Sequence, residues 1–151
     1  MQELSFYDID GERLILDKSL GSAQSTYSSQ FSAEMAFDEI SDEGDRYYCS
    51  QNRVTTGWLK YDFQSPVGIS KYAIERLNGH SNQFSPVSWT LEGSVDDSSW
   101  IVLDEQSGHD SWNDGEIKEF EIRHSSKSNQ KRKLNLGCGR ILYAHIVKLF
   151  L

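Results

Sequence analysis

Cysteine and proline are scarce in this sequence, which has two of each among its 151 residues. Cys49 and Cys138 stand too far apart for the paired spacing of a metal knuckle. They form either one bridge that closes a long loop or two unreactive thiols, and we favour free thiols. A chain of this length buries roughly 70% of the surface that its unfolded form exposes. We therefore expect one domain that folds on its hydrophobic core, without needing disulfides or a metal ion.

The sequence also lacks a long uninterrupted apolar run. Its longest apolar stretch, residues 141–151, is interrupted by His145 and Lys148 and is far shorter than the roughly 20 residues of a spanning helix. Met1 is followed by Gln-Glu-Leu-Ser, which has neither the basic nor the apolar part of a signal peptide. We expect no transmembrane helix. The localisation stays open between cytoplasmic, for the chain as written, and secreted, for a domain cut from a longer protein.

Positive charge is in the minority, because 15 Lys and Arg residues stand against 23 Asp and Glu residues, for a net charge of −8. Nucleic-acid binding relies on Lys and Arg side chains, which neutralise phosphates and release counterions. The acidic balance therefore predicts no nucleic-acid partner. Six of the 15 basic residues lie after residue 126, and we interpret them as part of a solvated loop beside the final strand.

Motifs of the common enzyme classes are missing as well. The sequence contains no G-x-S-x-G, H-E-x-x-H, Walker or G-x-G-x-x-G motif. Its four histidines lie in different segments, at His80, His109, His124 and His145, and none is spaced as a metal pair. Glycoside hydrolysis needs two carboxyl groups at a defined separation in one cleft, and no such pair stands out. We predict that the protein is not an enzyme.

What the sequence does contain is a series of short extended runs. One helical turn is predicted over residues 32–38, with Ser32 as the capping acceptor and Glu34 in the first turn. Pro66 and Gly68 are expected to break the chain between two strands. The strands are expected in the runs 58–63, 69–77, 87–94, 100–103, 118–122, 134–136 and 142–151. Short strands separated by turns predict an all-β sandwich or barrel in a single domain.

Acidic residues gather directly after the predicted helical turn. The cluster consists of Asp38, Glu39, Asp42, Glu43 and Asp45. Ca²⁺ takes six to eight oxygen ligands from carboxylates and loop carbonyls, which a tight acidic loop can supply. The cluster is therefore either a calcium site, with Asp38, Asp42 and Asp45 as the carboxylate ligands, or an exposed acidic loop.

Aromatic and planar polar side chains are placed in turns rather than in strands. Rigid sandwiches commonly present their binding groups on such loops. An aromatic ring packs on the C–H face of a pyranose, while Arg, Asn and His side chains bond to hydroxyl groups. A sugar site is therefore predicted from Tyr47, Tyr48, Arg76, Asn78, His80, Asn82 and Trp112. For Trp112 and Tyr48 the alternative is a place at the edge of the core.

Five segments occur in an order that matches a known family. They are YSSQFSAEMAFD, GWLKYDFQSPVGISKYAI, SPVSWTLEGSVDDSSWIVLD, EIKEFEI and HIVKLFL, and the third is the most specific. Through them, residues 25–151 resemble the coagulation factor five/eight type C, or discoidin, domain, whose bacterial relatives include the family 32 carbohydrate-binding modules. The resemblance implies a jelly-roll β-sandwich of the galactose-binding-domain-like type. Such modules are non-catalytic and bind glycans, lipids or proteins through loops at one end.

The resemblance also implies a sugar-binding set, from which this sequence departs. Arg76, together with Asn78 or Asn82, corresponds to the family's sugar-binding Arg and Asn at a different spacing. Tyr47 and Tyr48 stand where galactose-binding members often have a His and a Trp. The long apolar loops with which clotting-factor members enter membranes have no counterpart, so we expect no membrane insertion.

The family's calcium site is matched only in part. Asp38 corresponds to a calcium ligand, whereas the final strand offers His145 and Lys148 where the family often has a Glu. We therefore expect at most one structural Ca²⁺, near Asp38. The sequence as a whole predicts a non-catalytic module that binds a glycan or glycoconjugate. An intracellular protein–protein interaction domain on the same fold is the alternative.

Overall fold

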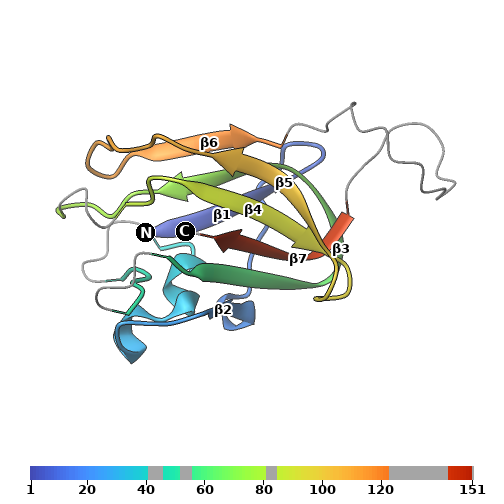
Figure 1. Cartoon of the computed structure of the whole chain (residues 1–151), viewed down its shortest axis with the longest axis horizontal. Coiled ribbons are helices and arrows are strands. Elements are labelled where there is room, and N and C mark those ends of the chain that lie inside the picture. The colour runs from blue at the N-terminus through green and yellow to red at the C-terminus, as the bar shows by residue number, and fades with distance from the viewer. Residues whose placement is uncertain (41–45, 52–55, 81–84, 123–142, 151) are drawn as a thin grey trace, which may run out of the picture.

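The structure is a computed structural model that describes residues 1–40, 46–51, 56–80, 85–122 and 143–150, the last of these as backbone. Figure 1 shows strands stacked in layers, with three short 3₁₀ helices beside them. The strands are β1 (Glu3–Asp8), β2 (Gly21–Ala23), β3 (Trp58–Glu75), β4 (Trp89–Ser94), β5 (Trp100–Gln106), β6 (Ile117–Glu121) and β7 (Tyr143–Phe150). The 3₁₀ helices are η1 (Lys18–Leu20), η2 (Ser29–Phe31) and η3 (Ala33–Ala36).

The long strand β3 joins the two layers. Its first part pairs with β2 and β7, and β7 continues through β4 to β5. Its second part pairs with β1 on one side and β6 on the other. Every pairing among the described strands is antiparallel. This arrangement confirms the predicted all-β sandwich.

The predicted break at Pro66 and Gly68 is wrong, because β3 runs through both residues. The register with β7 shifts between Asp62 and Val67, and Gln64 adopts a positive φ of 62° there. The Asp62 carboxylate accepts a hydrogen bond from the Gln64 amide at 2.8 Å, which stabilises the irregular turn of the backbone. Among the described residues, β3 and β7 make no ladder pairs between Asp62 and Val67. Proline's missing N–H therefore removes no ladder hydrogen bond there, and the strand bends from one layer into the other.

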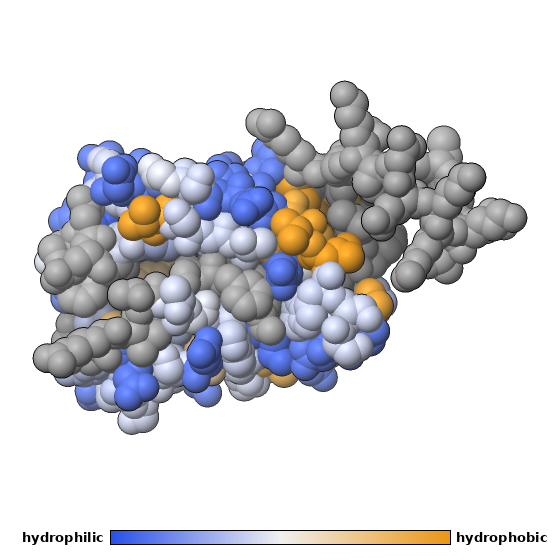
Figure 2. All heavy atoms as spheres, viewed as in Figure 1, coloured by the Kyte–Doolittle hydropathy of each residue, from blue (hydrophilic) through white to orange (hydrophobic). Residues whose placement is uncertain are grey.

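The alternating runs supply the core between the layers. Leu59 and Tyr61 of β3 and Trp89 and Leu91 of β4 are all at most 3% exposed, as their period of two predicts. Val87 does not continue the buried face of Trp89 and Leu91, since it precedes β4 and is 49% exposed. On the face drawn in Figure 2, the described residues are mostly hydrophilic and apolar side chains show only in small patches.

The core also contains one polar network. The Tyr72 hydroxyl donates to the Asp104 carboxylate and accepts from the Trp89 indole N–H, both at 2.7 Å. Tyr72 is fully buried, and burial is the main cause that raises the pKa of its hydroxyl far above the usual range. These hydrogen bonds connect β3 with β4 and β5.

The predicted helical turn is shorter than residues 32–38 and has a different cap. It is η3, a 3₁₀ turn whose N-cap is Ser32, and the Ser32 side chain makes no capping hydrogen bond. The Ser32 carbonyl instead accepts from the Met35 amide at 3.1 Å. The prediction of a side-chain cap at Ser32 is therefore wrong, since the tighter 3₁₀ turn satisfies its own first amides through the backbone.

Other predictions fall partly outside the described residues. Cys49 carries a free thiol, while Cys138 and the predicted strand 134–136 lie in the part of the chain that is not described. No helix among the described residues is long and apolar enough to cross a membrane.

Candidate functional site

Several loops meet at the end of the sandwich where β1, β4 and β6 begin and where β3 and β5 end (Figure 1). We call this region the loop end and define it by residues 24–31, 46–51, 76–80, 85–88 and 107–116. Backbone hydrogen bonds connect these loops in pairs. Tyr27 and Cys49 are bonded at 2.9 Å, as are Arg76 and Glu116 and also His109 and Val87. The loops are therefore joined to one another as well as to the strands.

Aromatic rings from three of these loops form a continuous row. The ring centroids of Tyr27 and Phe31 lie 5.9 Å apart, those of Phe31 and Tyr47 4.6 Å, and those of Tyr47 and His80 5.4 Å. Tyr27 is 58% exposed, and the other members are half-buried. We call these residues the aromatic row. It brings Tyr47 and His80 together, as the sequence predicted, although 33 positions separate them in the numbering.

Arg76 lies at one end of the aromatic row and is buried. Its guanidinium donates to the Asp114 carboxylate and to the His80 carbonyl. Asp114 also accepts from the Gly79 amide at 3.0 Å, in a turn where Gly79 has a φ of 73°. Since only 5% of Arg76 is exposed, its guanidinium shapes the loop rather than reaching into solvent.

Two predicted site residues lie in the core instead of on the surface. Trp112 is 4% exposed, and its indole N–H donates to the carbonyls of Pro86 and His109 at 3.0 and 2.9 Å. The Lys118 ammonium covers the ring at 4.2 Å from its centroid. Trp112 therefore has no open face for a sugar. Its position agrees with the alternative, a residue at the edge of the core.

Tyr48 is likewise buried, at 4% exposure. Its hydroxyl donates to the Ser25 carbonyl at 3.1 Å, and burial raises the pKa of that hydroxyl to about 12. Its role in this structure is to hold the 46–51 loop against the 24–31 loop. Of the remaining predicted residues, Asn78 lies in the exposed part of the 76–80 loop, and Asn82 is outside the described residues.

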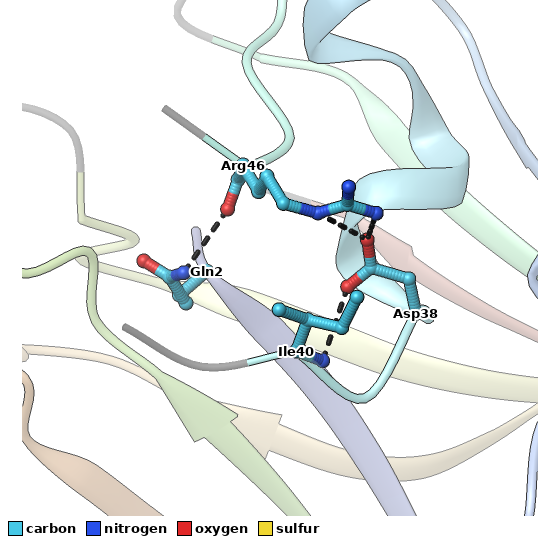
Figure 3. Close-up of polar contacts among 4 residues, drawn as sticks. All are labelled: Gln2, Asp38, Ile40 and Arg46. Carbon is cyan, nitrogen blue, oxygen red and sulfur yellow. Dashed lines mark hydrogen bonds and ion pairs between the residues drawn. The ribbon is translucent and has the colours of Figure 1, made fainter. Parts of the chain in front are cut away.

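The Asp38 carboxylate forms an ion pair with an arginine (Figure 3). Its Oδ2 accepts from Arg46 Nη2 at 2.6 Å and from Arg46 Nε at 3.2 Å, and its Oδ1 accepts from the Ile40 amide at 3.2 Å. Asp42 and Asp45 are outside the described residues. Within the described ranges, no three His, Cys, Asp or Glu side chains are grouped so that they could hold a metal ion.

Sequence reasoning missed Tyr27, Phe31 and Asp114. Tyr27 and Phe31 belong to the segment that resembles the family's opening motif, and nothing local distinguishes them from core residues. Asp114 stands in the dipeptide Asp-Gly, which signals a turn and not a partner for a distant arginine.

Near Asp38, the structure buries a carboxyl group that the sequence did not single out. Glu3 of β1 is 2% exposed and stands opposite Glu75 of β3, and its carboxyl oxygens form no hydrogen bond with a side chain in the described part of the chain. Arg13 is 3.9 Å away, too far for a hydrogen bond, and its side chain is 45% exposed. Burial, reinforced by the Asp38 carboxylate, raises the pKa of Glu3 from 4.5 to about 9.

This raised pKa predicts a stability that falls with pH. The folded protein keeps a proton on Glu3 that the unfolded chain releases, so the contribution of Glu3 is fully present below pH 4.5 and is lost as the pH rises toward about 9. The slope is at most about 1.4 kcal/mol per pH unit. Glu3→Gln keeps a neutral side chain and removes this dependence. Urea unfolding at pH 4.5 is expected to give the same free energy of unfolding for Glu3→Gln and the unaltered protein. At pH 8 the variant is expected to be the more stable of the two. Equal free energies of unfolding at both pH values would contradict this prediction.

Comparison with known proteins identifies the fold. The CBM32 module CpGH89CBM32-5 from Clostridium perfringens, in complex with GalNAc-β-1,3-galactose, matches with a TM-score of 0.57 and 16% identity over 86% of this chain and 81% of that module. Allantoicase from Saccharomyces cerevisiae matches with a TM-score of 0.51 and 15% identity, over 87% of this chain and 36% of the allantoicase chain. No family profile and no curated protein sequence matches. The chain therefore has the galactose-binding-like β-sandwich fold that the CBM32 module shows.

Proposed function

We propose that this protein is a non-catalytic module that binds a glycan at the loop end of its sandwich. The observation that carries the proposal is the aromatic row, which ends at His80, a residue whose carbonyl shares the Arg76 guanidinium with the Asp114 carboxylate. The module from Clostridium perfringens with the same fold was solved with a disaccharide. That likeness supports a sugar as the kind of ligand and leaves its identity to experiment.

The chemistry of the loop end suits a sugar. Tyr47 is held between Phe31 and His80, so its ring meets a ligand without first having to become ordered. Asp114 has a side chain that is 56% exposed, and a carboxylate accepts hydrogen bonds from sugar hydroxyls. Arg76 keeps Asp114 and the His80 backbone in place. An apolar surface beside fixed polar groups is the combination that a pyranose needs.

The proposed affinity is modest. A shallow site covers only part of a sugar, so little free energy remains after the costs of association, and we expect a dissociation constant on the order of 0.1–1 mM for a mono- or disaccharide. A glycan array identifies the ligand, and calorimetric titration then measures the affinity.

Tyr47→Ala is expected to weaken this affinity about tenfold or more, because it removes the central ring of the aromatic row. Tyr7→Ala is the matched control: Tyr7 lies at the far end of β1, where its ring contacts the Lys71 ammonium at 4.1 Å. The control is expected to bind as the unaltered protein does. Binding of no glycan on the array, or equal affinities of both variants and the parent, would refute the proposal. In that event, pull-down of a protein partner through the same loops tests the alternative predicted from the sequence.

A further inference from the structure

The family resemblance implies a calcium ion at Asp38, but the contacts of Asp38 do not fit one. Ca²⁺ is bound by six to eight oxygen atoms. Both oxygens of Asp38 instead accept hydrogen bonds from N–H groups, and the nearest is the Arg46 guanidinium at 2.6 Å (Figure 3). The Asp38 side chain is only 1% exposed, so one face of it is filled by the guanidinium and another by the Ile40 amide.

A guanidinium can replace a metal ion as a cross-link between two parts of a loop. It carries a permanent positive charge and several N–H donors in a fixed plane. Here it joins Asp38, just after η3, to the start of the 46–51 loop. The backbone of the same residue is fixed as well, because the Arg46 carbonyl accepts from the buried Gln2 side chain at 3.0 Å. The next residue along the chain is Tyr47, the central member of the aromatic row.

We propose that the Arg46 guanidinium is the resident counter-cation of Asp38, that it links Asp38 to the 46–51 loop without a metal ion, and that it thereby positions Tyr47. The part that concerns Tyr47 rests on the proposed glycan-binding function, whereas the part that concerns Asp38 does not. Arg46 is a positioning residue in this proposal, since it acts on a ligand through Tyr47.

Glu3 distinguishes a metal ion at Asp38 from the arginine, because only a metal ion would need a second carboxylate. Its two carboxyl oxygens are buried and form no hydrogen bond with a side chain of the described residues, so Glu3 would be the second carboxylate ligand of a cation bound beside Asp38. With Arg46 as the counter-cation, neither Glu3 nor calcium is needed to hold Asp38. Glu3→Gln therefore separates the two arrangements, because an amide is a much poorer calcium ligand than a carboxylate.

The first experiment measures thermal unfolding in calcium chloride and in EDTA. The unaltered protein is expected to melt at the same temperature in both, because a ligand that does not bind the folded state does not stabilise it. Arg46→Ala is expected to lower the melting temperature by about 5–10 °C in both solutions, since it leaves the Asp38 carboxylate buried without its charged partner. Arg46→Lys keeps a cation with fewer donors and is expected to recover part of this loss.

Two results would overturn the proposal. One is a calcium-dependent rise in melting temperature that disappears in Asp38→Asn or Glu3→Gln, which would place a metal ion at this position. The other is an Arg46→Ala variant that melts as the unaltered protein does. If Arg46→Ala does not fold, the smaller loss expected for Arg46→Lys provides the same test.

The second experiment measures glycan affinity at a temperature where every variant is folded. Arg46→Ala is expected to lose about fivefold or more in affinity, and Arg46→Lys to recover part of it. Unchanged affinity in Arg46→Ala would refute the positioning of Tyr47. If the unaltered protein binds no glycan, the proposed function fails, while the melting experiment still decides the role of Arg46 at Asp38.

Discussion

Replacing Phe37 by alanine is expected to lower the free energy of unfolding by about 3–5 kcal/mol, the largest loss of any single change considered for this protein. Phe37 is fully buried, and its ring centroid lies 4.9 Å from that of Tyr61 in β3. On another side the ring is so close to the backbone that a Cβ placed on Gly21 would lie 2.5 Å from Phe37 Cδ2. Because neighbours on both sides belong to strands, the cavity left by the ring cannot readily close.

Urea unfolding measures this loss, with the m value as a check that the unfolded states are comparable. Phe37→Leu is expected to lose clearly less, because leucine fills much of the same space. Ile15→Ala is the exposed control: Ile15 is 91% exposed, and its loss is expected to stay within about 0.5 kcal/mol. A loss below about 1 kcal/mol for Phe37→Ala would show that the core does not close around this ring.

Replacing Arg76 by alanine is expected to reduce glycan affinity more than tenfold and to lower stability by about 2–4 kcal/mol. The change removes the donors that hold the Asp114 carboxylate and the His80 carbonyl. The 76–80 loop and the 107–116 loop then lose the guanidinium that bonds to both of them. The effect on affinity depends on the proposed function, whereas the effect on stability does not.

Asp114→Asn separates these two effects. The amide still accepts a hydrogen bond from Arg76, so the loop is expected to keep its shape while the charge of an exposed side chain is lost. We expect a smaller loss of stability than in Arg76→Ala, with a measurable loss of affinity. Far-UV circular dichroism establishes that each variant is folded at the temperature of titration. An Arg76→Ala variant that is folded and binds with unchanged affinity would contradict the role given to Arg76.

Much of the fold could be predicted because its signals are local. The alternation of Leu59 and Tyr61, and of Trp89 and Leu91, identifies strands and their buried faces wherever one side of a sheet is covered. The same reasoning was wrong at Pro66, where it predicted that one strand ends and another begins. A proline at an unpaired bulge costs a strand nothing, and whether a position is paired depends on the neighbouring strand.

The site could be predicted only as a collection of loop residues. Tyr47, Asn78 and His80 are indeed at the loop end, but Trp112 and Tyr48, which are also aromatic loop residues, are buried. Composition cannot distinguish these cases, because exposure depends on which loops cover a ring. The partners of Arg76 and Asp38 could not be predicted from the sequence either, because loop geometry and not a motif determines which residues they contact.

The amino-acid sequence by itself determined that this chain forms an all-β sandwich or barrel with binding-type side chains in its turns, because alternation and turn chemistry act between neighbouring residues. Only the tertiary structure decided which of those side chains meet. Arg76 and Asp114 are 38 positions apart, and Asp38 and Arg46 are 8 positions apart. Such contacts depend on how strands of different layers stack, so the paths of the loops, and not the order of the residues, place the aromatic row beside its polar partners and an arginine beside Asp38.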